Sequence, residues 1–239
     1  MASVLKSLDE AEAEQPPLRD GDRMSQPEFH RRYEMIPAGI RFELIQGVVS
    51  MNAAAMKLPH NDYVSQLVTQ AMLYSRRTPG VHAGAGATVI LNEQNEPEPD
   101  VFLRLQPGLG GSSSNTEPHG GYVQGPPEQI IEIADSTVFR DLHQKKDVYQ
   151  QVGVKEYIVV CVENCEIKWF TWPEGEREIP PDKVLRSLLF PGFWLDVEAL
   201  FRLDGLRLEE VLFRGLASPE YVAFREELQG RKLRLEARS

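Results

Sequence analysis

One glutamate interrupts an otherwise continuous apolar run. Residues 129–134 have the sequence QIIEIA, and such a run predicts a central strand that is buried on both faces. Because side chains alternate across a strand, Glu132 lies on the face opposite Ile131 and Ile133. A buried carboxylate has to be paired with a cation or has to bind a metal ion. The chain therefore folds around a polar centre, which is either a structural ion pair or a functional site.

The segment after this strand offers polar partners for Glu132. Residues 139–152 are predicted to form a helix that ends near Gly153, since glycine is common just after a helix. Asp141, Lys145 and Tyr149 are spaced by four and therefore lie on one face of this helix. That stripe either lines the edge of a cleft or forms an ordinary solvent-exposed ion pair. The helix pattern by itself favours the second interpretation.

The remaining pattern predicts a mixed α/β fold around one sheet. The expected elements are helices at 25–35, 60–77, 139–152 and 217–232, strands at 81–91, 100–105 and 128–135, hairpins at 41–52 and 156–172, and a strand, turn and short terminal element over 183–201. We expect a flexible acidic leader at 1–24, one domain at 25–205 and a C-terminal helical extension at 206–239.

A segment rich in Gly, Ser and Pro, residues 106–127, predicts a long mobile loop. Long loops in compact domains are often functional. The segment is either a gate over a site or a flexible insert, and the sequence favours neither.

Charge and apolar patterning limit the classes of function. The net charge is −10, with 26 Lys and Arg against 36 Asp and Glu, which argues against tight sequence-independent DNA binding. A carboxylate-rich site that binds divalent cations offsets part of this charge. No apolar stretch of about 18 residues is present, so no membrane span is expected. Cys161 and Cys165 show no disulfide framework, and we expect a cytoplasmic protein with reduced thiols.

Two further carboxylates occupy comparable positions. Glu43 lies in the predicted strand RFELI, and Asp100 begins the strand DVFLRL. Together with Glu132 they would make an oxygen-rich site of the kind that Mg²⁺ or Mn²⁺ prefers. Lys145 could orient a water molecule or stabilise developing negative charge. These groups are sufficient for metal-assisted phosphodiester hydrolysis.

In this order, the segments resemble a known family. The chain is similar to the Uma-type restriction endonucleases of the PD-(D/E)xK nuclease superfamily over roughly residues 25–202. The matching segments are RFELIQGVVSM with Glu43, PHNDYV with His60, EPEPDVFL with Pro99 and Asp100, IIEIADST with Glu132, the pattern D-x3-K-x3-Y at Asp141, Lys145 and Tyr149, then GVKEYIVV and LLFPGFWLDVEALF. Each segment is weakly specific, and the ordered set is strongly specific.

The resemblance implies a restriction-endonuclease-like core with a mixed central sheet flanked by helices. It implies a Mg²⁺- or Mn²⁺-dependent endonuclease that acts on DNA, and we expect a homodimer. The expected catalytic residues are Glu43, Asp100, Glu132 and Lys145, the first three as metal ligands, with Asp141, Tyr149 and His60 in support. Capping or simple exposure is the alternative for His60.

One position departs from the superfamily signature, which places lysine two residues after the second acid. That residue is Ala134 here, so the resemblance points to Lys145 on the following helix. Lys146 is adjacent but lies about 100° further around the helix. The displaced lysine and the acidic charge leave a second hypothesis open, a catalytically inactive nuclease fold that acts as a homo-oligomeric interaction module.

Overall fold

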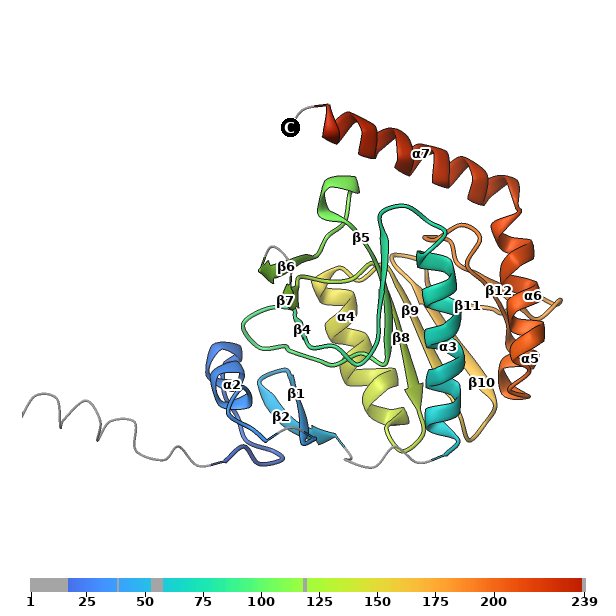
Figure 1. Cartoon of the computed structure of the whole chain (residues 1–239). Helices are drawn as coiled ribbons and strands as arrows, with labels where there is room; N and C mark the ends of the chain where they lie inside the picture. Colours follow the sequence, from blue (N-terminus) through green and yellow to red (C-terminus); the bar gives the residue numbers. More distant parts are fainter. Residues whose placement is uncertain (1–16, 38, 53–57, 118–119, 238–239) are drawn as a thin grey trace, which may run out of the picture.

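The computed structural model describes residues 17–37, 39–52, 58–117 and 120–237 (Figure 1). Residues 1–16 of the predicted acidic leader lie outside the described residues. Its last part is built into the fold, because Leu18 is buried in a small apolar cluster with Phe29 and Phe42. The folded region therefore begins before residue 25.

A six-stranded sheet forms the centre of the molecule, in the order β11-β10-β9-β8-β5-β3. The pair β8 and β9 is parallel, and the other neighbours are antiparallel, so the predicted mixed central sheet is confirmed. The strand bounds are β3 (Val81–Gly84), β5 (Val101–Leu105), β8 (Gln129–Ala134), β9 (Glu156–Cys161), β10 (Glu166–Thr171) and β11 (Gly175–Arg177).

Helices cover both faces of this sheet. Helix α3 (His60–Ser75) packs on β3, β5 and β8, and its buried side chains belong to the largest apolar cluster. Helix α4 (Lys146–Val152) contributes Val148 and Tyr149 to a second cluster on the other face. In Figure 1 the sheet lies between α3 and α4. This arrangement confirms the predicted α/β core with flanking helices.

Strand β8 divides its side chains between the two faces, as the alternation predicts. Ile131 and Ile133 belong to the cluster beneath α3, whereas Ile130 and Ala134 belong to the cluster beneath α4. Glu132 therefore faces the α4 side, where it is almost completely buried.

An N-terminal unit packs beside the sheet. Helix α2 (Gln26–Tyr33) precedes the predicted hairpin, which forms as β1 (Arg41–Ile45) and β2 (Val48–Asn52). Leu44 and Glu96 exchange backbone hydrogen bonds of 3.1 and 2.8 Å, which attach β1 to the segment before β5. The hairpin is thereby held next to the start of β5.

Two of the predicted segments are wrong. Residues 81–91 do not form one strand, because β3 and β4 (Val89–Ile90) lie in different sheets. Residues 106–127 are not a structureless loop, since they contain the 3-10 turn η1 (Pro107–Leu109) and strands β6 (Ser114–Glu117) and β7 (Gly120–Gln124), which form a sheet with β4. The buried Glu128 carboxylate accepts the Leu105 and Ser112 amides at 2.8 and 2.6 Å and so anchors this segment.

The C-terminal part completes the core. It contains strands β12 (Val184–Arg186) and β13 (Trp194–Asp196) and helices α5 (Val197–Phe201), α6 (Gly205–Leu216) and α7 (Pro219–Glu236). The largest apolar cluster includes Leu208, Leu212, Tyr221 and Leu228. The hydrophobic core thus continues past the predicted boundary at residue 205. In the described part of the chain, every helix is too short or too polar to cross a membrane.

Candidate active site

A buried lysine joins two of the predicted carboxylates. Lys145 Nζ lies 2.8 Å from Glu43 Oε1 and 3.0 Å from Glu132 Oε1. Glu43 comes from β1, Glu132 from β8, and Lys145 from the helical segment after β8. All three side chains are buried. The structure therefore brings together residues that are about a hundred positions apart in the sequence.

Asp100 lies beside Glu132 at the start of β5. The Asp100 amide donates to Glu132 Oε2 at 3.3 Å, and the Ile133 amide donates to Asp100 Oδ2 at 2.8 Å. These reciprocal bonds follow from the antiparallel pairing of Val101 with Ile131. The Asp100 side chain is 22% exposed, so it forms the solvent-facing side of the carboxylate pair.

Tyr149 and Asp141 converge on the same lysine and glutamate. The Tyr149 hydroxyl donates to Glu132 Oε1 at 2.8 Å, and Lys145 Nζ lies 3.9 Å from Asp141 Oδ1. The Thr137 hydroxyl donates to the Asp141 carboxylate, and the Tyr157 hydroxyl donates to the Asp141 carbonyl at 3.0 Å. The polar stripe predicted for this helix therefore faces the buried centre and not solvent.

The helix that carries these residues is not α-helical throughout. The segment η2 (Arg140–Lys145) is π-helical and continues into α4, which ends at Gly153 with φ 92°. Short π-helical segments are rare and often occur at functional sites. Lys146, the neighbouring lysine, lies over the Phe170 ring at 5.4 Å, so Lys145 is the lysine that faces the carboxylates.

Arg140 also reaches the site, although no pattern in the sequence distinguishes it. Its Nη2 lies 3.5 Å from Glu43 Oε2, and its side chain is 21% exposed. The other Glu43 oxygen, Oε1, accepts the Glu98 amide at 2.8 Å. The one available signal was the adjacency of Arg140 to Asp141, and that adjacency does not distinguish a site residue from a surface arginine.

His60, at the start of α3, faces Asp100. Its Nε2 lies 3.7 Å from Asp100 Oδ2, and the side chain is 21% exposed. The contact with Asp100 raises the pKa of His60, although burial opposes this shift. His60 therefore adds a cationic group beside the most exposed carboxylate of the site.

The carboxylates differ in how well their charge is compensated. Burial raises the pKa of Glu132 to about 8, and Lys145 offsets only part of this effect. Burial also acts on Glu43 and Asp100, but Lys145 and Arg140 lower the pKa of Glu43, and His60 and the Ile133 amide lower the pKa of Asp100. Burial also raises the pKa of Asp141, and Lys145 offsets only part of this effect. The cluster therefore carries more carboxylates than its cations neutralise, which favours an additional cation.

The chemistry of the donor groups fits a divalent metal ion. Asp100 and Glu132 supply carboxylate oxygens on neighbouring strands, the ligand type that Mg²⁺ and Mn²⁺ prefer. Over the described ranges, no three His, Cys, Asp or Glu side chains are arranged to hold a metal ion. A metal site formed by Asp100 and Glu132 would therefore need water or substrate oxygens, and the predicted ligand role of Glu43 stays a prediction.

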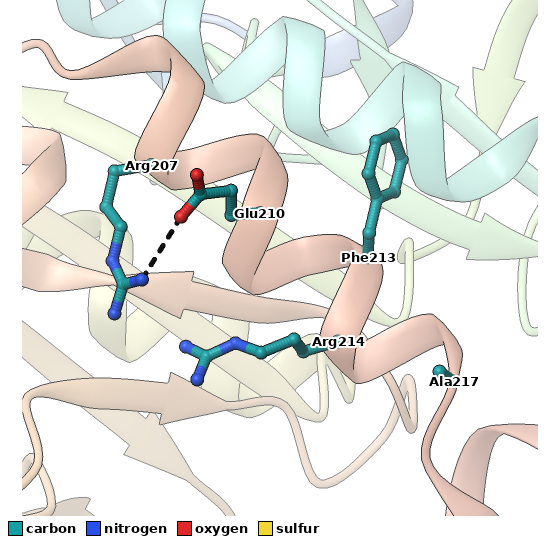
Figure 2. Close-up of a pocket in the computed structure, with 5 residues that line it drawn as sticks. All are labelled: Arg207, Glu210, Phe213, Arg214 and Ala217. Atoms are coloured by element: carbon teal, nitrogen blue, oxygen red, sulfur yellow. Dashed lines mark hydrogen bonds and ion pairs between the residues drawn. The ribbon is translucent and has the colours of Figure 1, made fainter.

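A separate surface hollow of about 530 Å³ lies on α6. It is lined by Arg207, Glu210, Phe213, Arg214 and Ala217, and Figure 2 shows an ion pair between Arg207 and Glu210 there. None of the predicted site residues lines this hollow. It is therefore distinct from the carboxylate cluster.

Comparisons with known proteins bear on the fold and the family. The family model Uma2, described as "Putative restriction endonuclease", matches residues 26–198. Among curated proteins, no sequence matches this chain. A crystal structure of a "putative nuclease belonging to DUF820" from Anabaena variabilis is similar, with a TM-score of 0.55 and 14% sequence identity. The similarity covers 72% of this chain and 97% of the other, and at this identity it supports the fold alone.

Proposed function

Because this chain belongs to the Uma2 family, we propose that it is a metal-dependent endonuclease that hydrolyses phosphodiester bonds in DNA. One observation carries the proposal. Asp100 and Glu132 lie side by side on neighbouring strands, and the Lys145 ammonium lies between Glu132 and Glu43. Carboxylates that can bind a metal ion, next to a fixed lysine, are sufficient for metal-assisted hydrolysis of a phosphodiester.

The proposed metal ligands are Asp100 and Glu132, with Mg²⁺ or Mn²⁺ as the ion. A bound divalent ion would polarise the phosphoryl oxygen and lower the pKa of a water molecule. The Asp100 side chain is partly exposed, so substrate could contact it. Glu132 is buried and accepts hydrogen bonds from Lys145 and Tyr149, which fix its position. Glu132 would thus be a rigid ligand that does not have to reorganise when substrate arrives.

The proposed roles of the cations follow from their burial. Lys145 is buried and bound to two carboxylates, so its ammonium fixes their positions and contributes positive charge toward the phosphate. Arg140 and His60 are partly exposed at the same cluster and would contact the scissile phosphate first. Asp141 and Tyr149 would position Lys145 and Glu132.

Calorimetric titration of Mn²⁺ tests the metal part of the proposal without knowledge of the substrate. We expect the wild type to bind Mn²⁺ and Asp100→Asn to lose this binding. Asp147→Asn is a matched control, because Asp147 is an exposed carboxylate on α4. A cleavage assay on plasmid and single-stranded DNA with Mn²⁺ then tests hydrolysis with the same three proteins.

A second function is favoured by one feature of the site. The Lys145 ammonium already lies between Glu43 and Glu132, as it would in a purely structural ion-pair network. In an inactive nuclease fold that serves as an interaction module, neither Mn²⁺ binding nor DNA cleavage would depend on Asp100. Absence of both, with the fold intact by circular dichroism, would support this second function over the endonuclease.

The homodimer is a further part of the proposal. In a homodimer, each of two symmetry-related sites would act on one DNA strand. Sedimentation velocity of the full chain, with and without DNA, measures the oligomeric state directly, and a monomer under both conditions contradicts the dimer.

A further inference from the structure

An exposed aromatic ring stands at the edge of the carboxylate cluster. Phe139 is 72% exposed, and among the described residues it and Phe213 are the exposed large aromatic side chains of apolar type. The Phe139 ring lies 4.6 Å from the His143 ring, with an angle of 44° between the two planes. Because most of the Phe139 side chain is exposed, it contributes little to the hydrophobic core. Packing therefore does not explain why an aromatic residue occupies this position.

The position of this ring connects it to the site. Phe139 directly precedes Arg140, whose guanidinium lies 3.5 Å from Glu43. Along η2, Phe139 and His143 face solvent while Asp141 and Lys145 face the buried carboxylates. Figure 1 shows that the C-terminal end of β8, which leads into Phe139, lies at the same end of the sheet as the start of α3 with His60.

We infer that Phe139 and His143 form a stacking platform for a nucleobase of the substrate, which is therefore single-stranded or locally unpaired DNA. The inference rests on the proposed function and specifies its substrate. In a regular duplex both faces of each base are already covered by neighbouring base pairs. An unpaired base exposes a face, and stacking on an aromatic side chain is the common way in which proteins bind it.

The charge of the protein supports this substrate class. Duplex binding without stacking depends on many phosphate contacts from Lys and Arg. This chain carries a net charge of −10, and several surface arginines are already paired with carboxylates, for example Arg186 with Asp182, Arg207 with Glu210 and Arg231 with Glu227. Stacking supplies affinity that does not require additional positive charge, which suits an acidic protein.

Two probes of equal charge isolate the stacking contribution. One is a fluorescein-labelled oligo-dT strand, and the other is an abasic strand of the same length, with the same phosphates and no bases. Anisotropy titrations with Ca²⁺ in place of Mn²⁺ measure binding without cleavage. The variants are Phe139→Leu, which keeps an apolar side chain without a ring, and Phe139→Trp, which keeps the ring. Phe213→Leu on α6 is the matched control.

We expect the wild type to bind oligo-dT about tenfold or more tightly than the abasic strand, as base stacking on one aromatic residue predicts. Phe139→Leu should reduce this ratio to near one, while Phe139→Trp and Phe213→Leu should keep it. A ratio near one in the wild type, or an unchanged ratio in Phe139→Leu, overturns the platform. Tighter binding of a duplex than of oligo-dT also overturns it.

A cleavage assay with Mn²⁺ on both oligo-dT and plasmid DNA separates this inference from the proposed function. If Phe139→Leu brings the ratio of oligo-dT to abasic-strand affinity to near one, and no protein cleaves either DNA, the platform is supported and the endonuclease is contradicted. Cleavage by the wild type with a ratio that Phe139→Leu leaves unchanged supports the endonuclease and overturns the platform. Failure of the wild type to bind oligo-dT overturns the platform, and failure to cleave both oligo-dT and plasmid DNA overturns the endonuclease.

Discussion

Replacement of Glu132 by glutamine should stabilise the protein and abolish its activity at the same time. Glu132 is buried, and burial raises the pKa of its carboxyl to about 8. The native state therefore favours the neutral carboxylic acid, whereas the unfolded chain is ionised above pH 4.5. Glutamine is neutral in both states and has nearly the same shape. It removes the cost of burying the charge, and it removes the proposed metal ligand.

The size of the effect depends on pH in a defined direction. The carboxyl of Glu132 has a higher pKa in the folded protein than in the unfolded chain, so proton binding favours the folded state. This contribution to stability is complete below pH 4.5 and is lost as the pH rises through about 8. At ~1.4 kcal/mol per pH unit, the wild type loses up to ~4 kcal/mol between pH 4.5 and 7.5. Glutamine cannot accept the 3.3 Å bond from the Asp100 amide and attracts Lys145 less. We therefore expect a net gain of ~1–2 kcal/mol at pH 7.5.

Thermal unfolding of both proteins in EDTA measures this gain. For a chain of this size, ~1 kcal/mol corresponds to ~2–4 °C in Tm. We expect Glu132→Gln to melt above the wild type at pH 7.5 and below it near pH 4.5, where the wild-type carboxyl is neutral and only the lost hydrogen bond from the Asp100 amide counts. Glu128→Gln is the control, because Glu128 uses both carboxylate oxygens to accept backbone amides. That variant should melt lower, since a glutamine amide nitrogen cannot accept a hydrogen bond.

A Glu132→Gln protein that is less stable than the wild type at pH 7.5 would refute this reasoning. It would mean that the ionised Glu132 stabilises the native state through Lys145 and Tyr149 more than burial destabilises it. A stabilised variant that still cleaves DNA at the wild-type rate would instead remove Glu132 from the proposed metal ligands.

Three further predictions concern the ion pairs, the C-terminal helices and the DNA contacts. Lys145→Met should lower the free energy of unfolding in urea by ~3–5 kcal/mol, because Glu43 and Glu132 lose a buried cation; a loss under ~1 kcal/mol contradicts the buried network. Leu228→Ala should cost ~2–5 kcal/mol, because this side chain lies in the main core, whereas the exposed Leu233→Ala should change stability little; equal effects would contradict a core that extends into α7. The slope of log K against log salt for oligo-dT should lie between about −1 and −2, as one to three phosphate contacts predict; a slope steeper than about −4 would show that phosphate contacts dominate.

Local pattern was sufficient for much of the fold. The apolar run around Glu132 predicted a central strand and the face that carries the carboxylate, and both are confirmed by the clusters on the two sides of β8. Gly153 predicted the end of a helix and has the positive φ expected there. Such features depend on neighbours within one or two turns, so they can be predicted from a single sequence.

Other features depend on contacts between distant segments. Strands β6 and β7 lie in the segment for which the sequence predicts a loop, because they are short, mostly polar and next to several glycines. They are held in place by pairing and by Glu128. The π-helical turn of η2 and the approach of Arg140 to Glu43 have no local signature. Both Arg140 and Lys145 of this segment contact Glu43 on β1, which lies about a hundred positions away in the sequence.

The sequence by itself determined that Glu132 needs a polar partner, because burying a carboxylate in an apolar strand demands one whatever the surrounding fold. Only the tertiary structure decided what that partner is. Lys145 lies between Glu132 and Glu43, Asp100 faces solvent beside His60, and Phe139 stands exposed at the edge. Burial cost is a property of a residue and its immediate neighbours, whereas the distances that make a site arise from segments that folding brings together.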